Sequence, residues 1–210
     1  MGGVDKLVSA AEAKQYFNEL TYEREPDGEV YIDCGAYNGD SVLAYLDFVN
    51  HSYKRIYAFE PVHLNMQQLR AATSEYKNIE YIEKGTWSNT TTLQFSESAS
   101  ASFVDNNGGA SIDVVCIDEI INGESVTFIK MDVEGSEYET LRGAENTIRK
   151  HMPKLAVCVY HKKDDLFKFI DYLSSLSNET YMYRFYLRQH SCSAYETVLY
   201  AIPIKKEKSL

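Results

Sequence analysis

The chain has 210 residues and a net charge of −10, with 44% hydrophobic and 25% charged residues. This length suits one sizeable domain and is short for two. The acidic balance and the scattered Lys and Arg residues argue against a nucleic-acid groove, which normally needs a basic patch. No apolar run approaches the roughly 18 residues of a membrane span, and the first residues lack the apolar core of a signal peptide, so we expect no membrane partner.

The cysteines lie far apart in the sequence, at Cys34, Cys116, Cys158 and Cys192. This spacing argues against a zinc cluster or a redox C-x-x-C motif. The first three lie in strand-like apolar runs, where cysteine usually acts as a small core side chain. We therefore expect a reduced, cytoplasmic protein.

Strand and helix patterns alternate along the chain. A first helix is expected over residues 6–20, and residues 1–28 are assigned to an N-terminal helical cap. Strands are then expected in "EVYIDCG", "RIYAFE", "NIEYIEKG", "VTFIKMD", "KLAVCVY", "YMYRFYLRQH" and "ETVLYAIP", with helical periodicity between most of them. Two weaker runs, "TTLQF" and "IDVVCI", predict short edge strands around the polar segment "SESASASFVDNNGGAS".

This alternation predicts an α/β fold, a doubly wound and mostly parallel sheet with helices on both faces. The last two strands lack an intervening helix, so that pair is expected to be antiparallel. We expect a single domain with a core over residues 29–203 and a tail over 204–210. Ser136 and Glu139 match the S-x-x-E capping box and predict the start of a helix.

The segment "YIDCGAYNGDS" joins the first strand to a helix and contains the spacing G-x-x-x-G at Gly35 and Gly39. In a doubly wound sheet such a turn lies where ligands bind, although a plain tight turn is an equal alternative. Glu60 ends the second strand, where an acidic residue binds a ribose diol in Rossmann-like folds; an exposed strand-end carboxylate is the alternative. Together, loop and carboxylate predict an adenosine-type cofactor, and the missing G-x-G-x-x-G argues against a nicotinamide dinucleotide.

The pieces "DCGAYNGDS", "YAFEP", "FIKMDVEGSE" and "RGAENTIRKHMPKLAVCVYH" occur in this order in the chain. Over about residues 29–203 the sequence resembles the FkbM-type S-adenosylmethionine-dependent methyltransferases, and "FYLRQH…ETVLYA" looks like one branch of that family. The resemblance implies a class I methyltransferase fold with a seven-stranded sheet whose last strand is antiparallel. It also implies S-adenosylmethionine bound by Glu60 and by the loop residues Gly35, Ala36, Tyr37 and Gly39. Family members commonly methylate hydroxyl groups on small molecules or sugars.

The chemistry of this cofactor suggests further contacts. Asp33 could bind the methionine ammonium directly or through water. The adenine is expected near the end of the third strand, around Gly85, Thr86 and Trp87. As the only tryptophan, Trp87 could equally be an ordinary half-buried aromatic residue.

Methyl transfer to an alcohol also requires loss of the hydroxyl proton, which calls for a general base or a metal ion. The candidates lie at or beyond strand ends: Asp132, Glu134, His161 and His190. Each has an alternative. Asp132 could have the purely structural role of pairing with Lys130. His161 could be a surface residue at a helix entry, and His190 could lie in a solvated turn.

Lys130 precedes Asp132 by two residues on the same strand face, so we expect it to balance that carboxylate. Asp132 and Glu134 are suitable oxygen donors for Mg²⁺, but no third and fourth ligand is evident, and no obligatory metal is expected. Glu137 is interpreted as a first-turn charge that favours the helix dipole.

The leading hypothesis is thus an S-adenosylmethionine-dependent methyltransferase acting on a hydroxyl of a small molecule or glycan. Two alternatives stay open, a nicotinamide-dependent oxidoreductase on a Rossmann-like fold and a cofactor-binding module without catalysis. No oligomeric state follows from the sequence.

Overall fold

The computed structural model describes residues 14–22, 28–94, 111–192 and 195–207. Its centre is a seven-stranded sheet in the order β3-β2-β1-β7-β8-β10-β9. The strands are β1 (Val30–Cys34), β2 (Arg55–Phe59), β3 (Ile79–Ile82), β7 (Phe128–Met131), β8 (Lys154–Cys158), β9 (Tyr181–Gln189) and β10 (Thr197–Lys205). β1, β2, β3, β7 and β8 pair in parallel, and β10 pairs antiparallel with both β8 and β9. The α/β fold class and the antiparallel last strand are therefore confirmed.

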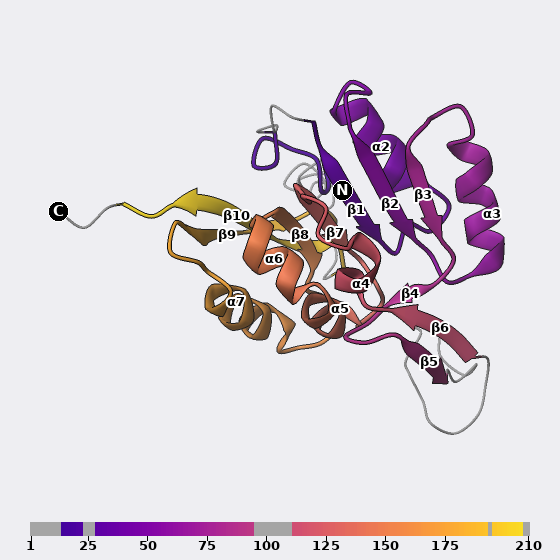
Figure 1. Ribbon diagram of the computed structural model, residues 1–210. Coiled ribbons are helices and arrows are strands. Elements are labelled where there is room, and N and C mark those ends of the chain that lie inside the picture. The colour runs from indigo at the N-terminus through magenta and orange to yellow at the C-terminus, as the bar shows by residue number, and fades with distance from the viewer. Residues whose placement is uncertain (1–13, 23–27, 95–110, 193–194, 208–210) are drawn as a thin grey trace, which may run out of the picture.

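Helices cover both faces of this sheet (Figure 1). They are α2 (Asp40–Phe48), α3 (His63–Ala72), α4 (Ile117–Ile121), α5 (Glu137–Gly143), α6 (Glu145–His151) and α7 (Asp165–Ser175). One core cluster joins α4, α5, α6 and α7 to the face that carries Ile32, and the other joins α2 and α3 to the face that carries Tyr31. All of β1 is buried because both of its faces are covered. Among the described helices, none is both long and apolar enough to cross a bilayer.

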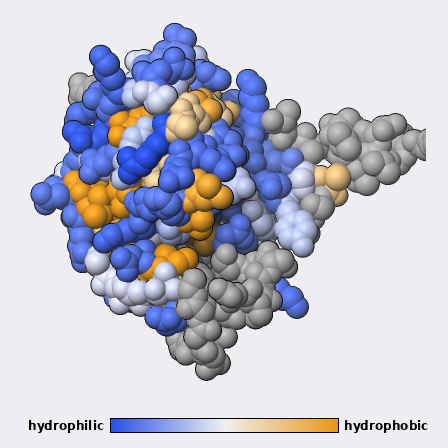
Figure 2. All heavy atoms as spheres, turned by 90° about the vertical axis from the view of Figure 1, so that its right-hand side faces the viewer, coloured by the Kyte–Doolittle hydropathy of each residue, from blue (hydrophilic) through white to orange (hydrophobic). Residues whose placement is uncertain are grey.

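A second, three-stranded sheet has the order β4-β6-β5 and lies beyond the carboxyl ends of β1, β2 and β3 (Figure 1). It contains β4 (Gly85–Thr86), β5 (Thr91–Gln94) and β6 (Ser111–Val115). The two short strands expected here, β5 and β6, do form, but they pair with each other rather than with the main sheet, and β6 also pairs with β4. Most of the polar segment between them lies outside the described residues. The face that carries α3 and this sheet is largely hydrophilic, with separate hydrophobic spots (Figure 2).

The helix predicted over residues 6–20 is wrong where the structure describes it, since residues 14–22 form bends and turns; residues 6–13 lie outside the described part. Phe17 packs its ring within 5.5–5.8 Å, between centroids, of the rings of Tyr31, Tyr45 and Phe128. Tyr16 adopts a left-handed φ of 62°. Phe17 is therefore an aromatic anchor, and its insertion into the core overrides the local helical pattern.

Candidate functional site

A cavity of about 570 Å³ lies at the carboxyl ends of the central strands. Its lining includes eight residues singled out from the sequence, namely Gly35, Tyr37, Glu60, Gly85, Thr86, Trp87, Asp132 and Glu134. The other candidates do not line it: Asp33, Ala36, Gly39, His161 and His190. The fold thus brings most of the proposed cofactor residues to one cavity, and neither histidine lines that cavity.

The glycine loop is shaped by contact with the protein itself. Gly35 has φ +79°, and a Cβ at this position would lie 2.0 Å from the backbone oxygen of Asp132. Gly39 has φ +96°, and its Cβ would lie 2.9 Å from Leu69 Cδ1 on α3. Gly35 therefore lets the loop cross the end of β7 beside the cavity, whereas Gly39 serves the packing of α2 on α3.

Glu60 is held with its carboxylate at the cavity, and its residue exposure is only 5%. One carboxylate oxygen accepts a hydrogen bond from the Tyr37 N–H at 3.0 Å. The other accepts from the Val62 N–H at 2.9 Å and from the Asn65 amide at 3.2 Å. A carboxylate accepts about four hydrogen bonds, so Glu60 keeps capacity for one donor from a ligand such as a ribose diol.

The predicted pairing of Lys130 with Asp132 is wrong, because the ion-pair partner of Lys130 is Asp33, with 3.1 Å between Nζ and Oδ1. Lys130 also donates to the backbone oxygen of Gly35 at 2.7 Å, and Ser41 donates to Asp33 Oδ2 at 2.6 Å. Burial alone would lower the pKa of Lys130, but the charges of Asp33 and then Asp132 raise it above its usual range. Asp33 is fully buried, and Lys130 and Ser41 already bind its two carboxylate oxygens. The ammonium of Lys130 thus occupies the position beside Asp33 that was expected for the ammonium of the cofactor.

The segment expected at the adenine is fixed by close backbone packing. The Trp87 N–H donates to the Val115 oxygen at 3.0 Å, which continues the pairing of β4 with β6. Thr86 Oγ1 lies 2.8 Å from Thr140 Oγ1 on α5. A Cβ on Gly143 would lie 2.0 Å from the Trp87 oxygen, so the end of α5 presses directly on this segment.

Asp132, at the end of β7, receives a tyrosine hydroxyl on each carboxylate oxygen. Tyr16 donates to Oδ2 at 2.9 Å and Tyr160 donates to Oδ1 at 3.1 Å. Burial, and then nearby negative charge, raises the pKa of both tyrosines above its ordinary value, so both stay protonated donors. Sequence reasoning missed both partners. Tyr16 is separated from Asp132 by 116 positions and lay in an expected helix, so no sequence signal could have found it.

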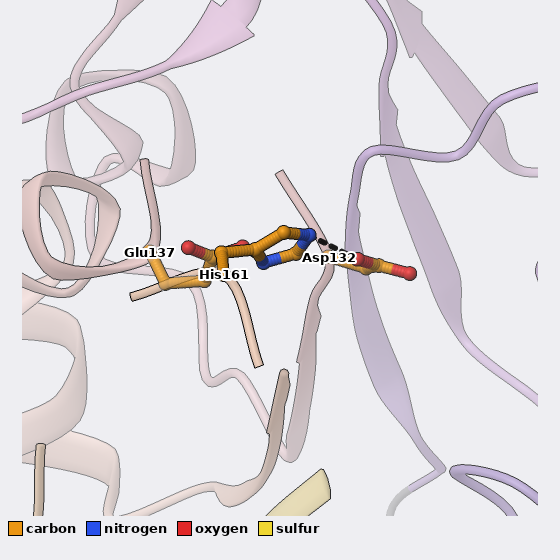
Figure 3. A group of neighbouring side chains, drawn as sticks. All are labelled: Asp132, Glu137 and His161. Carbon is orange, nitrogen blue, oxygen red and sulfur yellow. Dashed lines mark ion pairs between the residues drawn. The ribbon is translucent and has the colours of Figure 1, made fainter. Parts of the chain in front are cut away.

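Behind Asp132, the imidazole of His161 lies between carboxylates (Figure 3). Its Nδ1 lies 2.9 Å from Glu137 Oε1. Its Nε2 lies 3.4 Å from Glu134 Oε2 and 3.8 Å from Asp132 Oδ1. Burial lowers the pKa of His161, but the contact with Glu137 and the charges of Asp132 and Glu134 outweigh it, so the pKa is raised.

The start of α5 corrects one sequence-based interpretation and extends another. Ser136 makes no capping hydrogen bond with its side chain, so the predicted capping box is wrong. Glu137 does lie in the first turn of α5, as expected, but it is also fully buried. Its Oε1 accepts from the Val133 N–H at 3.0 Å and from the Gly135 N–H at 3.3 Å. The S-x-x-E spacing hid this residue, because the acidic side chain that binds backbone N–H groups lies two positions before the Glu139 of that motif.

His190 lies apart from this group. Its Nε2 lies 2.8 Å from the hydroxyl of Tyr200. That hydroxyl also accepts from the Tyr16 N–H at 3.1 Å and from the Asn18 amide at 3.0 Å. His190 therefore contacts the residues that hold the segment 14–22, and not the cavity.

The same side chains group atoms that could act as metal ligands. One ligand atom from each of Asp132, Glu137 and His161 lies within 4.8 Å of the others. The imidazole stands between the carboxylates, however, with a different ring nitrogen toward each (Figure 3). Metal–ligand bonds are only about 2.0–2.2 Å long, so a cation on one nitrogen would leave the carboxylate beyond the other nitrogen out of reach. The arrangement fits a base held by an orienting carboxylate better than it fits a chelate.

The family described as "Methyltransferase FkbM domain" matches residues 33–185. No functionally curated protein matches the chain in sequence. Among solved structures, methyltransferase FkbM from Methylobacillus flagellatus KT is similar with a TM-score of 0.76 and 30% identity, covering 94% of this chain and 50% of that one. The chain thus spans half the length of that protein.

Two more distant structures share the fold. A putative methyltransferase from Streptococcus mutans in complex with SAH has a TM-score of 0.54 and 16% identity, covering 90% of this chain and 94% of that one. Fibrillarin from Aeropyrum pernix, with natively bound S-adenosyl-L-methionine, has a TM-score of 0.56 and 12% identity, covering 88% and 69%.

Proposed function

The chain belongs to the FkbM methyltransferase family, and on that premise we propose that it transfers the methyl group of S-adenosylmethionine to a hydroxyl of a small molecule or glycan. The observation that carries this proposal is that Glu60 and Asp132, which directly follow β2 and β7, line the same cavity. A buried carboxylate with spare acceptor capacity suits a ribose diol. A second carboxylate, held by two tyrosine hydroxyls, suits the handling of an acceptor hydroxyl.

In the proposed complex the ribose binds Glu60 and the adenine lies along Gly85, Thr86 and Trp87. The methionine end lies on the loop of Gly35 and Tyr37. Lys130 lines the cavity while bound to Asp33. An ammonium has three donors, and two of those of Lys130 are directed at Asp33 and the Gly35 oxygen. The third suits the methionine carboxylate, so we assign Asp33 an indirect role through Lys130.

The acceptor is expected beside Asp132, where Tyr16 and Tyr160 also line the cavity. Methyl transfer is an in-line displacement, and alignment of donor and acceptor is worth several kcal/mol. We propose that Asp132 contacts the acceptor hydroxyl and that Glu134 and His161 support it. We assign no catalytic role to His190, because its ring nitrogen contacts Tyr200 instead of the cavity.

Calorimetric titration with S-adenosylhomocysteine (SAH) tests the cofactor. We expect one site per chain, and NADH is the control ligand for an oxidoreductase. Tight NADH binding without SAH binding would overturn the proposal. Incubation with methyl-labelled S-adenosylmethionine and a small-molecule extract, followed by mass spectrometry, tests the activity. SAH binding without any labelled ether would instead support a binding module.

A further inference from the structure

We propose that Glu137 is a positioning residue that holds His161 so that Asp132, His161 and Glu134 form a path for the proton of the acceptor hydroxyl. This inference rests on the proposed function and deepens it, because such a path is needed only for an acceptor that must lose a proton. It adds Glu137, which was not among the site residues predicted from the sequence.

The burial of Glu137 is the first argument. A fully buried carboxylate is costly unless it is paired and hydrogen-bonded. Two backbone N–H groups, of Val133 and Gly135, hold its Oε1. Its Oε2 has no hydrogen-bond partner among the described residues. An exposed side chain would be enough to cap a helix, so the full burial of Glu137 points to a further role. We assign that role to its contact with His161 Nδ1, at 2.9 Å.

The orientation of the ring is the second argument. Nδ1 lies beside Glu137 Oε1, and Nε2 faces Asp132 and Glu134. Neither ring nitrogen makes a hydrogen bond of regular geometry with the described residues, so these contacts are electrostatic, and a proton on Nδ1 suits the carboxylate of Glu137 at 2.9 Å. The side chain of His161 is only 9% exposed, so the ring does not itself border the cavity. Asp132 and Glu134 do border it. The ring therefore exchanges protons with the cavity through these carboxylates.

The chemical step then balances without a further reactant. The acceptor oxygen forms its bond to the methyl carbon as the C–S bond breaks, and that electron pair stays on sulfur. The hydroxyl proton passes to Asp132 and from there, through one bridging water, to His161 Nε2, which lies 3.8 Å from Asp132 Oδ1. This gives an imidazolium flanked by carboxylates. The proton leaves to water through Glu134, whose side chain is 59% exposed and whose Oε2 lies 3.4 Å from Nε2.

Besides the three carboxylates, the segments next to this ring carry further titratable groups. Asp165 begins α7, and burial and then the charge of Glu137 raise its pKa. Lys162 donates from its backbone N–H to Asp165 at 3.0 Å and from its ammonium to the Gly135 oxygen. The ring of Tyr160 lies beside the imidazole, tilted by 41°, with 4.1 Å between the ring centroids. Burial lowers the pKa of His161, but the contact with Glu137 and the charges of Glu137, Asp132 and Glu134 outweigh it. Removal of the Glu137 charge should therefore lower this pKa.

The test is an NMR pH titration of the His161 imidazole with ¹⁵N-labelled histidine, in the intact chain with and without SAH. We expect a pKa above the ordinary value of about 6.5 in the wild type and a clear fall in Glu137→Gln. Glutamine keeps an oxygen for the two backbone N–H groups, so the fold should survive. Glu139→Gln is the matched control, because Glu139 lies in the same helical turn but pairs with Arg142 at 3.0 Å.

The rate of labelled-methyl transfer to the extract, measured against pH, supplies the catalytic readout. The rate should rise with pH through the pKa of His161, since the neutral ring accepts the proton. In Glu137→Gln this rise should move to lower pH with a lower plateau, and His161→Asn should lower the plateau by about 10²-fold or more, the usual contribution of acid–base catalysis.

The outcomes separate this proposal from the proposed function. If SAH does not bind, the function fails and the catalytic role of the path fails with it. If SAH binds and methyl is transferred, but His161 titrates alike in Glu137→Gln and Glu139→Gln, only the present inference fails. A pH profile that ignores Glu137→Gln, or a full plateau in His161→Asn, also overturns it.

Discussion

Substitution of Gly35 by alanine tests how the loop beside the cavity is held. The added Cβ would lie 2.0 Å from the Asp132 oxygen and 3.0 Å from its carbonyl carbon. Non-bonded heavy atoms prefer about 3.5–4.0 Å. The backbone cannot move freely, because the Asp132 N–H donates to the Cys34 oxygen at 3.1 Å and ties β7 to β1. The variant must therefore separate two paired strand ends.

The expected loss of stability has two parts. A non-glycine residue in the left-handed region costs roughly 1–2 kcal/mol, and overpacking typically costs about 1–3 kcal/mol more. A loss of about 3 kcal/mol lowers the melting temperature of a domain of this size by roughly 6–12 °C. SAH affinity should fall as well, because Gly35 lines the cavity.

Thermal unfolding followed by circular dichroism measures the change, and Gly123→Ala is the matched control. Gly123 has a similar φ of +83°, but the nearest atom to its Cβ would be Lys150 Nζ at 3.7 Å. This variant carries the backbone strain without the clash and should lose only about 1–2 kcal/mol. Equal losses in the two variants would refute the argument that contact with β7 requires a glycine at position 35.

Glu60→Ala should raise the Kd for SAH roughly 10- to 100-fold, because hydrogen bonds to a charged group are worth about 1.5–3 kcal/mol; an unchanged calorimetric Kd would contradict the assigned ribose contact. Lys130→Met should cost about 3–5 kcal/mol in denaturant unfolding, because it leaves Asp33 buried without its ion-pair partner, and a loss below about 1 kcal/mol would not fit the pairing. Gly143→Ala should weaken SAH binding by displacing the Trp87 backbone, and calorimetry with a wild-type affinity would argue against an adenine site there. Dialysis against a chelator should leave SAH binding and methyl transfer unchanged; restoration of lost activity by a divalent cation would show that a metal is required.

Much of the fold could be predicted from local patterns. The alternation of strands and helices and the antiparallel last strand follow from the spacing of residues that are close in the chain. The polar residues at strand ends could be assigned to one site because the carboxyl ends of parallel strands lie at the same edge of the sheet, where ligands bind. Errors arose where a tertiary contact outweighed a local preference. The packing of Phe17 in the core prevents the helix that was expected there. At the start of α5, the side chain of Glu137, and not that of Ser136, binds backbone N–H groups.

The sequence by itself determined the sheet, the glycine turn after its first strand and the placement of Glu60 and Asp132 at its carboxyl edge. These features depend on local patterns, because each of the two carboxylates directly follows a strand that can be read from its own residues. Only the tertiary structure decided which charges pair. Lys130 binds Asp33 rather than Asp132, Tyr16 reaches Asp132 across 116 positions, and His161 meets Glu137. The free energy of such pairs depends on burial and on the distance between atoms brought together by the fold, and neither quantity is written in the spacing of residues along the chain.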